Sequence, residues 1–83
     1  MEKSEILETL LEEVALATET HKIAQAEFRA VIKDIPSDLP HPDGVQRIAN
    51  ASTACAQARE KERVARIRLE QFQAYGFIPK DLK

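Results

Sequence analysis

The chain has 83 residues, of which 31% are charged, and its formal net charge is only −2. This length allows one domain with a small core, a size at which association between copies is a common source of stability. The small net charge excludes a global field that would draw the chain to nucleic acid or to an anionic membrane. Cys55 is the only cysteine, so no disulfide can close within the chain. We therefore expect a cytoplasmic protein, and no apolar run approaches the ~20 residues of a membrane span.

The segment from Glu2 to Asp34 contains neither proline nor glycine. Apolar residues recur there with the spacing of three and four that is typical of an amphipathic helix. Glu2, Glu5 and Glu8 lie where the positive end of the helix dipole favours carboxylates. The pattern predicts a first helix over residues 3–34.

A proline-rich stretch follows, with three of the four prolines between Ile35 and Gly44. Pro36 disfavours the helical conformation for the residue before it, and Pro42 suits the first turn of a new helix. We expect a turn over residues 35–41. His41, with Asp38 and Asp43 near it, suggests a docking loop, but the prolines favour the interpretation of a plain connector.

The segment from Val45 to Tyr75 again lacks proline and glycine and is rich in good helix formers. Gly76 stands where a left-handed C-terminal cap is expected, and Pro79 follows. We expect a second helix over residues 42–75 and a tail over residues 76–83. Phe77 and Ile78 make this tail apolar, so we expect it to dock on a helix or on a second subunit.

The two predicted helices fit each other as the antiparallel arms of one hairpin, so residues 1–83 form a single all-α domain. Heptads place one core position at residues 7, 14, 21 and 28 and at residues 48, 55, 62 and 69. Residues that face each other across the two arms then have numbers that sum to about 79. This register sets large side chains opposite alanines in the middle of the hairpin. The predicted pairs are Leu7–Phe72, Leu10–Leu69, Val14–Ala65, Ala17–Glu62, His21–Ala58, Ala24–Cys55, Phe28–Ala51 and Val31–Ile48, flanked by Ile6–Tyr75, Glu13–Arg68, Asp34–Arg47 and Ile32–Val45.

Charge also favours this pairing. The first arm, from Glu2 to Asp34, has eight acidic and four basic residues, and the second, from Val45 to Tyr75, has six basic and three acidic residues. An acidic arm beside a basic arm selects the hairpin over self-paired helices, although each exposed ion pair contributes only ~0–1 kcal/mol.

Two helices leave much apolar surface in water, which predicts a homodimer in the form of a coiled-coil-like four-helix bundle. One flank of the hairpin offers Leu16, Ile23 and Val64, and the other offers Leu11, Ile32 and Val45. The sequence does not decide between these two interface candidates.

His21 and Glu62 are the strongly polar residues at predicted core positions. A functional interpretation is a buried acid/base pair, or a metal site of two His and two Glu created by the dimer axis. The interpretation we favour is a polar layer that fixes the register of the helices. Cys55, between alanines, is expected to be an inert small hydrophobe.

The segment from Arg59 to Arg68 is the one basic cluster, and a nucleic-acid site would use Arg63, Arg66 and Arg68 against phosphates. The alternative is a solvated helix face that pairs with the acidic arm, and no aromatic residue for base stacking lies within the cluster.

The sequence thus predicts a small non-enzymatic interaction or structural module with no cofactor, acting as a homodimer with a further protein partner. A nucleic-acid-binding regulator and a metal- or ligand-binding bundle are the two alternatives. No glycine-rich phosphate loop or metal motif supports catalysis.

Overall fold

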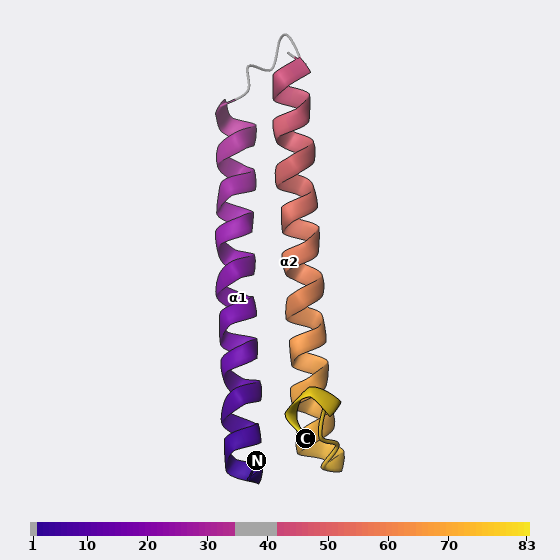
Figure 1. Ribbon diagram of the computed structural model, residues 1–83. Helices are drawn as coiled ribbons and strands as arrows, with labels where there is room; N and C mark the ends of the chain where they lie inside the picture. Colours follow the sequence, from indigo (N-terminus) through magenta and orange to yellow (C-terminus); the bar gives the residue numbers. More distant parts are fainter. Residues whose placement is uncertain (1, 35–41) are drawn as a thin grey trace.

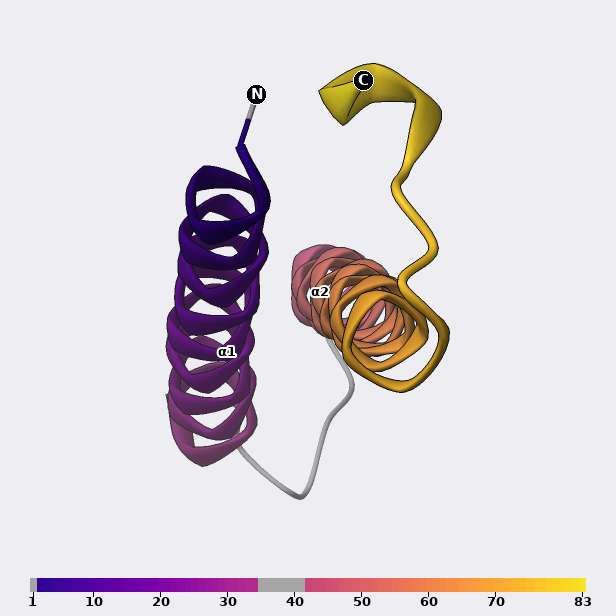
Figure 2. The same ribbon diagram turned by 90° about the horizontal axis from the view of Figure 1, so that it is seen from below.

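The computed structural model describes residues 2–34 and 42–83. It contains two long helices, α1 (Lys3–Asp34) and α2 (Pro42–Tyr75), and a short 3-10 helix, η1 (Lys80–Leu82). The long helices lie side by side and run in opposite directions (Figures 1 and 2), in a rod of 57 × 18 × 16 Å. This confirms the predicted all-α hairpin and the predicted bounds of both helices. The predicted turn at 35–41, with Asp38 and His41, lies outside the described residues.

The C-terminal end of α2 follows the predicted glycine cap. Gly76 has a φ of +69°, in the left-handed region that favours glycine. Its N–H donates to the carbonyl of Phe72 at 2.9 Å, and the N–H of Phe77 donates to the carbonyl of Gln71 at 3.3 Å. The chain therefore leaves the helix sharply, and Figure 2 shows the tail curving back beside the N-terminal end of α1.

The core between the helices is thin and lined mainly by small side chains. The buried apolar residues in the described part of the chain are Ile6, Leu10, Ala24, Ala58 and Ala65. Ile6 and Leu10, at 1% and 0% exposure, lie in the first turns of α1. The alanines allow the two helices to approach closely, as the predicted large-opposite-small packing requires.

The structure corrects one predicted contact near the termini and bears on the predicted docking of the tail. Tyr75 is 83% exposed, so the predicted packing of Tyr75 on Ile6 is wrong. Phe77 is 65% exposed, whereas Ile78 and Leu82 are half-buried, so only part of the apolar tail docks within the chain.

None of the helices in the described part of the chain combines enough length and apolar character to cross a bilayer.

Candidate functional site

His21 and Glu62 meet between the two helices, as their adjacent core layers predict. His21 Nδ1 and Glu62 Oε2 lie 3.0 Å apart, with side chains only 17% and 19% exposed. On the other carboxylate oxygen, Glu62 Oε1 accepts a hydrogen bond from Arg66 Nε at 3.2 Å. Arg66 Nη2 also donates to the Thr18 hydroxyl on α1 at 3.5 Å. These four residues form one polar cluster, and Thr18 and Arg66 were not predicted as its members.

The charge state of this cluster follows from its contacts. The hydrogen bond with His21, aided by the charge of Arg66, holds the pKa of the Glu62 carboxyl below its usual value. Because an ionised carboxylate can only accept, the Nδ1 of His21 carries the proton in this hydrogen bond. The cluster therefore joins α1 and α2 by a charge-assisted contact. It lies at one level of the seam between the two helices, whose buried side chains are mainly alanines.

The same cluster offers little for acid/base or metal chemistry. Neither His21 nor Glu62 lines any of the three grooves described in this section, of which the largest two measure about 470 and 460 Å³. Within residues 2–34 and 42–83, no group of three His, Cys, Asp or Glu side chains converges as metal ligands would. His21 and Glu62 alone supply two ligands.

Arg68 is a second junction, and it joins three segments of the chain. Its Nη2 lies 3.3 Å from Glu13 Oε1 on α1 and 2.9 Å from Asp81 Oδ2 in η1. The register predicts the Glu13 pair, and the more distant pair of Arg47 with Asp34 at 4.0 Å, and both are confirmed. The role of Asp81 was missed, because no pattern in the sequence indicates which way the tail turns after Gly76.

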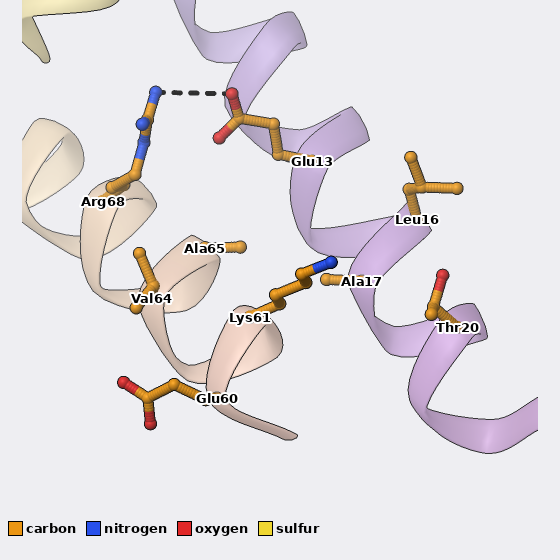
Figure 3. Close-up of a pocket in the computed structure, with 9 residues that line it drawn as sticks. All are labelled: Glu13, Leu16, Ala17, Thr20, Glu60, Lys61, Val64, Ala65 and Arg68. Atoms are coloured by element: carbon orange, nitrogen blue, oxygen red, sulfur yellow. Dashed lines mark hydrogen bonds and ion pairs between the residues drawn. The ribbon is translucent and has the colours of Figure 1, made fainter. Parts of the chain in front are cut away.

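The structure places the two sets of interface candidates on different flanks. Leu16 and Val64 line one groove of about 460 Å³ between the helices (Figure 3). A second groove of about 270 Å³ continues from it and contains Ile23, and the two share Thr20 and Lys61. We call this continuous feature the Leu16 groove. Its lining residues are Glu13, Leu16, Ala17, Thr20, Ile23, Ala24, Glu27, Ala54, Gln57, Ala58, Glu60, Lys61, Val64, Ala65 and Arg68.

The Leu16 groove has an apolar floor and a charged rim. Ala17 and Ala65 form the floor, and the Glu13–Arg68 ion pair closes the end nearest the tail (Figure 3). Leu16 is 71% exposed and Val64 43% exposed at the sides of the groove. The opposite candidates, Leu11, Ile32 and Val45, are 47%, 49% and 55% exposed and line none of the described grooves.

The three arginines of the predicted nucleic-acid site do not share one surface. Arg63 is paired with Glu60 and Arg66 with Glu62, each within α2. Arg68 lies two residues beyond Arg66, about 200° around the helix, and is held on the opposite flank by Glu13 and Asp81. The structure therefore separates the residues that the sequence grouped.

Comparisons of the chain with protein-family models, with curated proteins and with solved structures found no match.

Proposed function

We propose that this protein is a non-enzymatic interaction module that acts as a homodimer of helical hairpins, as a four-helix bundle in the cytoplasm. The observation that carries the proposal is the Leu16 groove. This groove runs between the helices with alanines as its floor and with the exposed side chains of Leu16, Ile23 and Val64 along its sides. Exposed apolar strips of this length on a small protein are typical of interfaces.

The thin core supports the same conclusion. Only two large side chains, Ile6 and Leu10, are fully buried in the described part of the chain. Other large apolar side chains between the helices, such as Phe28, Leu69 and Phe72, are only half-buried, so a single hairpin removes only part of their apolar area from water and gains only part of the stabilisation that full burial gives. Association of two copies would bury the exposed leucine, isoleucine and valine and make up this deficit. A dimer would also offer a larger rigid surface to a further protein partner.

The two alternatives from the sequence gain no support. Arg63 and Arg66 are neutralised by glutamates of their own helix, and Arg68 faces away from them. The polar pair of His21 and Glu62 lies in the seam with Arg66 and Thr18, a position that suits fixing the register of the hairpin. A cytoplasmic location fits the free thiol of Cys55, since reducing compartments keep such thiols unpaired.

Sedimentation equilibrium over a range of micromolar concentrations tests the proposal. We expect a dimer of twice the 9.3 kDa chain mass, with dissociation only at the lowest concentrations. A species of 9.3 kDa that persists at tens of micromolar would refute the homodimer.

A further inference from the structure

The two exposed flanks of the hairpin differ in charge. On the flank of Leu11, helical spacing places Lys22 and Arg29 on α1 and Arg59 on α2 around the apolar residues. None of these three basic residues has an acidic partner within 4 Å among the described side chains. Glu70 lies on the same face of α2 as Arg59, three helical turns away, but the basic residues of this flank outnumber it. Two copies that met through this flank would therefore bring together surfaces of net positive charge, which costs free energy.

The Leu16 groove has the opposite character. Its α1 side carries Glu13 and Glu27, and its α2 side carries Lys61 and Arg68 together with one acidic residue, Glu60, which is paired with Arg63. In Figure 3 the Lys61 side chain extends across the groove toward Ala17 on α1. A second copy can therefore meet this flank with acid opposite base, but only if its α2 lies over the α1 of the first.

This condition selects one symmetry. A two-fold axis parallel to the helices places α1 of each copy over α2 of the other, with both turn ends at the same end of the bundle. A two-fold axis across the helices would place α1 over α1, so acidic arms would face each other. Isologous contact about the parallel axis is therefore favoured by charge.

Leu16 and Val64 fit the same arrangement. They lie at one level on the two sides of the groove, so the parallel axis brings Leu16 of one copy against Val64 of the other, twice. The tail, fastened by the pair of Asp81 with Arg68, occupies the terminal end of this flank. Contact between copies then begins at the level of Leu16 and runs toward the turn end.

We infer that the Leu16 groove is the surface on which a second copy of this chain docks, with both turn ends pointing the same way. In this dimer Leu16 and Val64 of both copies form one four-residue apolar layer. The inference rests on the proposed homodimer and adds its face and its symmetry.

Leu16→Glu tests the face, with Leu11→Glu as the matched control on the other flank of the same helix. Both side chains are exposed, so circular dichroism should show that both variants keep the helical content of the wild type. Because the symmetric layer loses two buried leucines, we expect Leu16→Glu to raise the dimer dissociation constant by a factor on the order of 100. Leu11→Glu should leave it within about threefold of the wild type, as expected for a surface substitution.

The outcomes separate the two proposals. A dimer that survives Leu16→Glu but is lost in Leu11→Glu overturns the inferred face and leaves the homodimer standing. A wild-type protein that is monomeric overturns both.

The symmetry has its own measurement. A spin label at Lys33→Cys, in a Cys55→Ala background, marks the turn end of α1. With helices packed about 10 Å apart, the parallel axis predicts two labels within about 30 Å of each other. A separation above about 40 Å would place the labels at opposite ends of the 57 Å rod and would overturn the inferred symmetry.

Discussion

Arg68 and Asp81 form an ion pair of 2.9 Å that fastens the C-terminal tail to α2. The same guanidinium nitrogen contacts Glu13, so α1, α2 and the tail meet on one side chain. Ile6 and Leu10, the two fully buried large residues, lie toward the termini from this junction. The ion pairs of Arg68 therefore hold the tail on one flank of the hairpin, and they lie at the end of the exposed Leu16 groove.

The first prediction concerns this junction. Arg68→Met keeps most of the apolar stem but removes both ion pairs, and it leaves Glu13 and Asp81 without their partner. We expect a loss of about 1 kcal/mol in the free energy of unfolding, and we assign it to the Glu13 pair, because Arg68 and Glu13 are only 27% and 35% exposed whereas Asp81 is 59% exposed and screened by solvent. Urea denaturation at a fixed protein concentration measures the loss.

Arg47→Met is the matched control for that change. Arg47 and Asp34 lie 4.0 Å apart with side chains 55% and 69% exposed, so this pair should contribute less than about 0.5 kcal/mol. Equal losses in the two variants would mean that the junction at Arg68 has no special role.

The second prediction concerns the cap of α2. In Gly76→Ala the added methyl group would meet no atom within 4 Å, so the cost comes only from the positive φ of +69°. We expect a loss of about 1 kcal/mol in the free energy of unfolding, the usual penalty for a left-handed residue with a Cβ. Gln73→Ala, on the exposed surface of the last helical turn, should change it by less than about 0.5 kcal/mol. A Gly76→Ala variant as stable as the wild type would show that the cap does not hold this conformation in solution.

The third prediction concerns the polar cluster. A double-mutant cycle with His21→Ala and Glu62→Ala should give a coupling energy of about 0.5–2 kcal/mol, since the two side chains share a partly buried hydrogen bond. A parallel cycle with His21→Ala and Glu70→Ala should give none, because Glu70 is exposed and forms no described ion pair. Additive losses for His21 and Glu62 would contradict the contact between the helices.

The fourth prediction is a dependence of stability on pH. The pKa of Glu62 is lowered in the folded state by His21 and Arg66, and that of Asp81 is lowered by Arg68. A carboxyl group whose pKa is lower in the folded than in the unfolded protein stabilises the folded state. This contribution is fully present above the ordinary pKa values, which are 4.5 for Glu62 and 3.8 for Asp81. This stability is then lost as the pH falls through the lower pKa values of the folded protein.

Urea midpoints between pH 6 and pH 3 measure this effect. In Glu62→Gln the urea midpoint should fall less steeply with decreasing pH than it does in the wild type. Glu70→Gln should leave this pH dependence unchanged. A wild-type midpoint that is constant down to pH 3 would contradict the assigned hydrogen bonds.

Much of this fold could be predicted because local signals and long-range signals agree. The prolines and Gly76 mark the ends of helices whatever the tertiary packing, so the bounds at residues 3–34 and 42–75 follow from local chemistry. The register follows from the alternation of large residues and alanines, and it led directly to the contacts of Glu13 with Arg68 and of His21 with Glu62.

The rest could not be read from the sequence for physical reasons. The tail after Gly76 has no periodic pattern, so nothing in its residues indicated that Asp81 would return to Arg68 or that Tyr75 would stay exposed. The grouping of Arg63, Arg66 and Arg68 was based on proximity along the chain, whereas helical geometry places Arg68 on the other flank. Both apolar flanks have similar composition, and only the groove and the distribution of charge separate them.

Small-angle X-ray scattering of the wild-type protein at about 50 µM, a concentration at which interfaces of ordinary size are occupied, shows whether two hairpins pack side by side. A side-by-side dimer predicts twice the 9.3 kDa chain mass with a radius of gyration of about 18–20 Å, only slightly above the 17.6 Å of one hairpin. A mass of 9.3 kDa would contradict the dimer, and a doubled mass with a radius well above this range would contradict packing along the groove.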